Sequence, residues 1–128
     1  MWRKLLNPNL IGSYSFCRLR MSSSLQPKLY VLQYDYVADA LEKRKPYREN
    51  HLALINSQVE KGNVVLAGAV GNPPTGGLLI FRNLTPNDIE QVAQKDPYVV
   101  NGVVEKYSIK PYIAVVGDSL LSNDLIKV

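Results

Sequence analysis

Three residues in the middle of the chain, Arg48, His51 and Asp96, have side chains whose types and spacing could support proton transfer. His51 is the only histidine, and an imidazole both takes up and releases a proton near neutral pH. In a helix, Arg48 falls about 40° from Leu52, inside the predicted apolar stripe, and His51 falls about 100° from Leu52, beside it. An arginine that faces a core needs an anionic partner, and Asp96 is the candidate.

Two interpretations of these three residues stay open. In the first they form a structural polar cluster, because a histidine beside a core is usually held by hydrogen bonds. In the second, His51 moves a proton on a substrate, Asp96 fixes the tautomer of the imidazole, and Arg48 holds an anionic substrate group. A catalytic histidine must face a cavity that a small molecule can enter, so the surroundings of His51 discriminate between them.

Metal and phosphate chemistry lack matching residues. One cysteine, Cys17, and one histidine cannot supply a Cys/His zinc site, so no metal is expected. The glycines at positions 68, 71, 76 and 77 could suggest a phosphate-binding loop, but no Gly-Lys-Ser/Thr follows them and the segment leads into a strand. The sequence therefore predicts chemistry without a cofactor.

Hydrophobic periodicity and turn residues predict the elements that must position these side chains. Strands are predicted at residues 28–34, 64–70, 78–81 and 103–111, and helices at residues 37–44, 47–61 and 86–95, with residues 71–77 as a loop. Leu52, Ile55 and Val59 fall on one face of the longest helix and predict its buried side. Thr85 and Asp88 predict a capping box at the start of the last helix, which ends at Asp96.

This order of elements is β-α-β-β-α-β, the ferredoxin-like plan of the α+β class. It predicts a four-stranded antiparallel sheet with two helices on one face. The chain supplies no helix for the other face, so we expect a homodimer that covers it.

The basic charge lies in the first residues. The formal net charge is +4, but five of the 15 basic residues precede residue 29, and no acidic residue precedes Asp35. Residues 29–128 then carry ten basic and eleven acidic residues, so no nucleic acid partner is expected. No apolar run approaches the roughly 18 residues of a membrane-spanning helix, so no membrane partner is expected either.

The N-terminal segment, residues 1–27, has the composition of a targeting leader. Arginines and serines without acidic residues are typical of a mitochondrial transit peptide, so we expect a mitochondrial matrix location. A disordered basic tail is the alternative interpretation. Translation from Met21 would give a cytosolic form.

Several short motifs in order resemble those of the YciI-like, or YCII-related, family. They are Leu41-Glu42-Lys43-Arg44, Arg48-Glu49-Asn50-His51-Leu52, Val65-Leu66-Ala67-Gly68, Asp96-Pro97-Tyr98-Val99, Asn101-Gly102-Val103 and Ile109-Lys110-Pro111-Tyr112. The resemblance implies a ferredoxin-like domain at residues 28–112, in the superfamily of dimeric α+β barrels, followed by a C-terminal tail at residues 113–128.

The resemblance also implies a site. Family members place a histidine and an aspartate in a pocket between helix and sheet, and these fall at His51 and Asp96 here. Arg48 and Tyr98 are then expected to bind the substrate. One relative is a dehydrochlorinase of a chlorinated hydroxyquinol. The resemblance thus implies a small cofactor-free lyase or isomerase acting on a small organic molecule, and the alternative is a non-catalytic homodimer that binds a metabolite or a partner.

Overall fold

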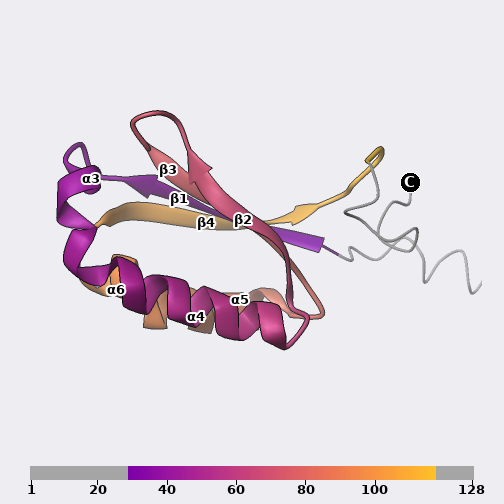
Figure 1. Cartoon of the computed structure of the whole chain (residues 1–128). Coiled ribbons are helices and arrows are strands. Elements are labelled where there is room, and N and C mark those ends of the chain that lie inside the picture. Colours follow the sequence, from indigo (N-terminus) through magenta and orange to yellow (C-terminus); the bar gives the residue numbers. More distant parts are fainter. Residues whose placement is uncertain (1–28, 118–128) are drawn as a thin grey trace, which may run out of the picture.

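The computed structural model describes residues 29–117, which form one layer of strands and one layer of helices (Figure 1). The elements in chain order are β1 (Leu29–Tyr36), α3 (Ala40–Lys43), the 3-10 turn η1 (Lys45–Tyr47), α4 (Arg48–Glu60), β2 (Val64–Val70), β3 (Gly76–Arg82), α5 (Pro86–Lys95), α6 (Pro97–Val100) and β4 (Val104–Tyr112). The predicted leader at residues 1–27 and residues 118–128 of the predicted tail lie outside the described residues.

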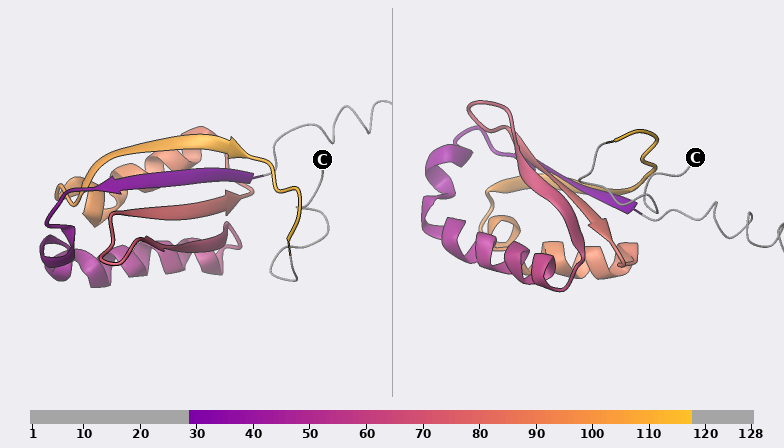
Figure 2. Two further views of the ribbon diagram at one scale, coloured as in Figure 1. Left: turned by 90° about the horizontal axis from the view of Figure 1, so that it is seen from above. Right: turned by 45° about the vertical axis from the view of Figure 1, so that its right-hand side comes forward.

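The four strands form one antiparallel sheet in the order β2-β3-β1-β4. In the centre of the sheet, Leu32 of β1 lies opposite Leu79 of β3 and Ile109 of β4. Helix α4 packs on the β2 side and α5 on the β4 side, so both cover the same face (Figure 2). The predicted ferredoxin-like α+β fold is confirmed.

Alternation along the strands builds the core between the two layers. Leu32 and Tyr34 of β1 and Leu79 and Phe81 of β3 point toward the helices and are buried. The helices and the β4 end add further fully buried side chains, among them Ile89, Ala93, Tyr98 and Val103. These contacts fix the positions of α4 and α6 relative to β1, and those three elements carry the candidate site.

The predicted capping box of α5 is confirmed. The hydroxyl of Thr85 accepts a hydrogen bond from the backbone N–H of Asp88, and the Asp88 carboxylate accepts one from the N–H of Thr85. These hydrogen bonds hold the pKa of Asp88 below its usual value. The helix ends at Asp96 as predicted, but the short helix α6 follows at once, which the sequence did not predict.

The predicted buried side of α4 is wrong in part. Leu52 and Val59 are 41% and 48% exposed, and the buried residues of α4 are His51, Ile55 and Gln58. The apolar stripe borders a cavity instead of the core, so its outer members stay uncovered. The core face of this helix thus carries two polar side chains and one apolar side chain, spaced four and three residues apart.

Strand β3 begins two residues earlier than predicted, at Gly76. Gly76 and Gly77 pair with Asp35 and Tyr34 of β1. A Cβ atom on Gly76 would clash with the backbone carbonyl oxygen of Tyr34. The glycines that resembled a loop therefore let two strands approach closely.

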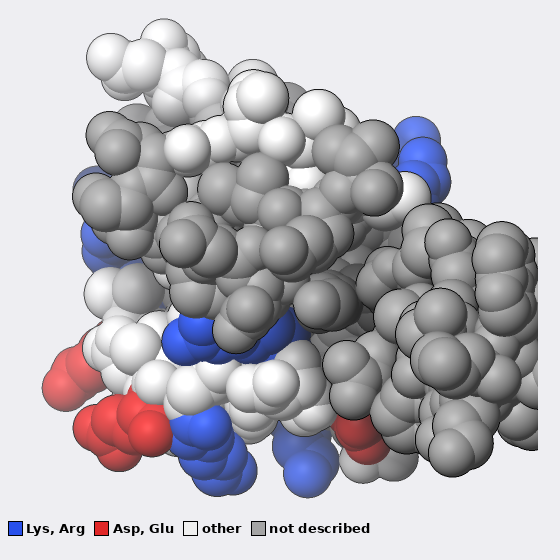
Figure 3. Space-filling view, turned by 90° about the vertical axis from the view of Figure 1, so that its right-hand side faces the viewer, with Lys and Arg blue, Asp and Glu red and all other residues white. Residues whose placement is uncertain are grey.

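Charged side chains of both signs lie next to one another along the edge that the helices form, on the face seen in Figure 3. No helix within residues 29–117 is long and apolar enough to cross a membrane.

Candidate active site

A buried carboxylate and an imidazole form the centre of the candidate site. The Nδ1 atom of His51, on α4, lies 2.8 Å from Oδ1 and 2.9 Å from Oδ2 of Asp96. Asp96 is 0% exposed. A carboxylate only accepts hydrogen bonds, so Nδ1 carries the proton and donates it. This arrangement fixes the tautomer in which Nε2 has a free lone pair.

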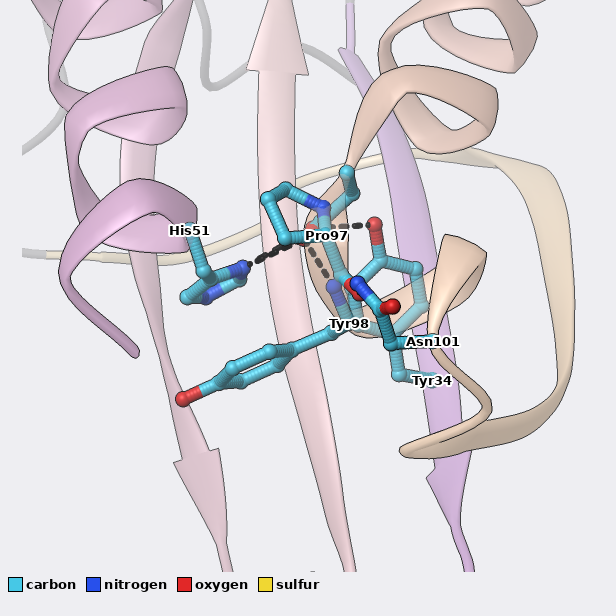
Figure 4. Close-up of polar contacts among 6 residues, drawn as sticks. Tyr34, His51, Pro97, Tyr98 and Asn101 are labelled. Carbon is cyan, nitrogen blue, oxygen red and sulfur yellow. Dashed lines mark hydrogen bonds and ion pairs between the residues drawn. The ribbon is translucent and has the colours of Figure 1, made fainter. Parts of the chain in front are cut away.

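Two further donors hold the same carboxylate. The hydroxyl of Tyr34 donates to Oδ2 at 2.8 Å, and the backbone N–H of Tyr98 donates to Oδ1 at 2.9 Å. Figure 4 shows Tyr34 and His51 reaching toward the same point from β1 and α4. Asp96 is also the N-cap of α6. One side chain therefore joins three elements, and its three donors compensate its burial.

Tyr34 is a donor throughout the ordinary pH range. Burial raises the pKa of its hydroxyl far above the usual value, and the neighbouring Asp96 charge raises it further. The sequence analysis missed this residue. The signal that could have found it is its place beside Leu32 on the core face of β1, because a buried tyrosine hydroxyl needs a partner.

His51 borders a cavity of about 470 Å³ between α4 and the β2–β3 side of the sheet. Its side chain is 11% exposed. With Nδ1 occupied by Asp96, Nε2 is the free ring nitrogen, and it makes no hydrogen bond to any residue within 29–117. The structure thus leaves a proton acceptor beside a space for a small molecule.

Small residues on the sheet make room for this cavity. The wall opposite α4 contains Ala67, Gly68 and Ala69 of β2 and Gly77 of β3. A Cβ atom on Gly77 would lie 2.9 Å from the hydroxyl oxygen of Tyr36. The absence of a side chain at Gly77 therefore keeps the Tyr36 hydroxyl at the cavity wall.

Tyr98 supports the imidazole with its ring. The ring centroids of Tyr98 and His51 lie 3.8 Å apart with an interplanar angle of 3°, so the rings are stacked. Tyr36 contacts Tyr98 edge to face at 6.1 Å. The hydroxyl of Tyr98 is buried and has no hydrogen-bond partner among the described residues, and it points away from Pro97 (Figure 4). Tyr98 lines the cavity and its ring holds the orientation of His51, and its binding of a substrate stays a prediction.

Arg48 does not bind Asp96, so the predicted ion pair is wrong. The Asp96 carboxylate is occupied by three other donors, and Arg48 is exposed at the start of α4. Arg48 instead lines the cavity together with Arg44, which the sequence analysis did not single out. The spacing of four residues between the two arginines is the signal that could have found Arg44, because such residues share one side of a helical segment.

Within residues 29–117, no group of three or more His, Cys, Asp or Glu side chains could hold a metal ion. The chemistry that the described geometry supports is proton transfer at Nε2 of His51.

Comparisons with known proteins agree with this arrangement of elements. A family model described as the YCII-related domain matches residues 28–113. The proteins named Protein YciI of Escherichia coli O6:H1 and of Shigella flexneri are each 34% identical to the chain over 93 residues, which cover 66% of the chain and 95% of the relative.

A solved structure shares the fold. It is 5-chloro-2-hydroxyhydroquinone dehydrochlorinase from Burkholderia phenoliruptrix AC1100 in complex with 2,5-dihydroxybenzoquinone. The superposition has a TM-score of 0.59 at 16% sequence identity and covers 67% of this chain and 94% of that chain.

Proposed function

The chain belongs to the YCII-related family, and from this premise we propose that it is a small lyase or isomerase that moves a proton on a small organic substrate. The observation that carries the proposal is the free Nε2 atom of His51 beside a cavity, with Nδ1 fixed by Asp96. A positioned imidazole of this kind is the commonest general base in enzymes.

In the proposed reaction, Nε2 of His51 takes a proton from the bound substrate. The imidazole then carries a positive charge, which the Asp96 carboxylate stabilises at 2.8 Å. The stacked ring of Tyr98 and the hydrogen bond to Asp96 hold the imidazole in one orientation beside the cavity. The same imidazole returns the proton to another atom of the substrate in an isomerisation, or to solvent after a leaving group departs in an elimination.

The activity named for the solved relative fits this scheme. A dehydrochlorinase removes HCl, so a base must take a proton while chloride departs. We extend this class of reaction, proton removal with departure of a leaving group, to the present chain.

The experiment follows proton removal directly. The purified protein is incubated in D2O with small phenols, hydroxyquinols and carbonyl compounds, and NMR records which C–H positions exchange with solvent; chloride release from 5-chloro-2-hydroxyhydroquinone is measured in parallel. We expect at least one compound to react faster with the protein than without it. A panel in which nothing exchanges and no chloride is released contradicts the proposal.

The second candidate function is a non-catalytic module that binds a metabolite. One observation favours it: the His51 side chain is only 11% exposed, which restricts the approach of a substrate. Under this candidate, compounds bind in the cavity and stabilise the protein against heat, but the exchange experiment detects no turnover.

We also propose that the protein is a homodimer paired through the face of the sheet that α4 and α5 leave uncovered. Side chains alternate between the two faces along a strand. Leu79 and Phe81 of β3 point into the core, so the residues next to them lie on the uncovered face. The apolar residues there are Val31, Leu66, Val70, Leu78 and Ile80, of which Leu66 is 55% and Val70 50% exposed. Faces of this composition are typical of protein interfaces.

If the protein is a homodimer, it should sediment with the coefficient of a dimer at micromolar concentration. The substitution Ile80→Asp places a charge in the centre of the proposed interface and should give a monomer. The control is Val100→Asp on α6, where the native valine is already 65% exposed. A wild-type monomer, or equal dissociation by both substitutions, contradicts the proposal.

We propose mitochondrial import from the composition of residues 1–24, which contain four basic residues and no acidic ones. A reporter fused to this segment should locate to mitochondria. Replacing Arg18 and Arg20 with glutamine should make the signal diffuse, because import uses the positive charge of such segments. A diffuse signal from the unmodified segment contradicts the proposal.

A further inference from the structure

Two arginines line one end of the cavity beside His51. Arg44 follows α3, and Arg48 is the first residue of α4. Neither guanidinium forms an ion pair with a carboxylate within residues 29–117. No aspartate or glutamate is among the residues that line the cavity. The two positive charges are therefore uncompensated by the cavity wall.

A neutral hydroxyl group accompanies the arginines. Burial raises the pKa of Tyr36 to about 12, and the positive charges of Arg44 and Arg48 act in the opposite direction, so both guanidinium groups lie within electrostatic range of this hydroxyl. Tyr36 is consequently protonated at neutral pH, and its hydroxyl can donate a hydrogen bond. Gly77 keeps the space next to that hydroxyl free of a side chain.

Apart from Asn56, most of the remaining wall is apolar. Leu52 and Val59 of α4 line the cavity and are 41% and 48% exposed. Ala67 and Ala69 add short side chains on the β2 side. The cavity thus has a cationic part and an apolar part, and its volume is at the small end of ligand pockets.

We propose that the cavity selects a small organic anion, namely a molecule about the size of a single ring that carries an ionised hydroxyl or carboxylate group. Arg44 and Arg48 bind the anionic oxygen atoms, since a guanidinium presents paired donors to such groups. The apolar wall contacts the rest of the molecule, and His51 faces the atom that loses the proton. This inference names the substrate class of the proposed enzyme and rests on that proposed function.

Matched pairs of probes test charge selection by calorimetry. 2,5-Dihydroxybenzoquinone, which is ionised at neutral pH, is compared with neutral hydroquinone, and benzoate is compared with neutral benzamide. We expect at least one anion to bind about tenfold or more tightly than its neutral partner, a preference equivalent to about 1.4 kcal/mol. The preference should weaken as salt concentration rises. Equal affinity within both pairs, including no binding by any probe, overturns the inference.

Substitutions test whether Arg44 and Arg48 cause the preference for the anion over the neutral probe. Arg44→Met and Arg48→Met should each weaken binding of the anion about tenfold and leave the neutral probe unchanged. Lys95→Met is the matched control, because Lys95 is exposed on α5 and does not line the cavity. Arg48→Lys should retain part of the preference, which separates lost charge from lost folding. An anion preference that both methionine variants retain overturns the assignment.

The anion preference and the proposed proton transfer can be tested separately. His51→Asn should keep the anion preference because it retains both arginines, and lose turnover. Turnover of a neutral compound without any anion preference would overturn the substrate class and leave the proton-transfer proposal standing. Anion binding without turnover would overturn the proton-transfer proposal and leave the substrate class standing.

Discussion

The Asp96→Ala variant is expected to lose about 3–5 kcal/mol of unfolding free energy, because it leaves two buried donors without an acceptor. The hydroxyl of Tyr34 and the N–H of Tyr98 both donate to this carboxylate, and the same residue begins α6. Removal of the carboxylate also frees the His51 ring. Chemical denaturation followed by fluorescence or circular dichroism measures the loss.

The control for this prediction is Asp35→Ala. Asp35 is about half exposed and lies 3.9 Å from Lys106, so its loss should cost no more than about 1 kcal/mol. Asp96→Asn tests the capping contribution, because an asparagine oxygen can still accept from the N–H of Tyr98. We expect it to be more stable than Asp96→Ala. Equal stability of Asp96→Ala and Asp35→Ala would show that the three hydrogen bonds contribute little.

The His51→Asn variant is expected to lose about 10²–10⁴-fold in turnover of any compound that the exchange experiment identifies. The asparagine amide can take the place of Nδ1–H and donate to Asp96, but it has no atom equivalent to Nε2. The substitution therefore removes the proposed base and retains the hydrogen bond that anchors it. Steady-state rates, measured with the substrate at saturation, give the comparison.

Asn50→Ala is the matched control for His51→Asn. Asn50 precedes His51 on α4, is exposed and does not line the cavity. Its replacement should leave turnover within about twofold of the wild type, since exposed substitutions of this kind seldom perturb a structure. Full turnover by a folded His51→Asn variant would remove the imidazole from the reaction.

Local patterns predicted most of the fold. The capping box of Thr85 and Asp88 lies within four residues, so its hydrogen bonds are encoded next to one another in the sequence. The strands β1 and β2 follow from short apolar runs in the same way, and β4 follows from a partial alternation of polar and apolar residues. The beginning of β3 was misplaced because glycine occurs in loops and in closely paired strands alike, and the clash at Gly76 involves a carbonyl on another strand.

The contacts of the candidate site depend on distant residues. Tyr34 and Asp96 are 62 positions apart, and no periodicity in either segment encodes their hydrogen bond. The pairing of Arg48 with Asp96 was wrong for the same reason: the competing donors come from β1 and α6. The stripe of α4 also could not be assigned to a core or to a cavity, because the difference arises from small side chains on β2.

The three hydrogen bonds to Asp96 affect which residues are retained as the family evolves. Because this carboxylate joins β1, α4 and α6, selection for folding alone retains it, whereas the Nε2 atom of His51 has no hydrogen-bond partner among residues 29–117 and is needed only for the proposed proton transfer. In a lineage that abandons the reaction, the histidine is therefore free to change first while the aspartate persists. Relatives that keep the aspartate and have lost the histidine should be binders descended from enzymes, and sorting homologues by this one position would separate the two groups before any assay is run.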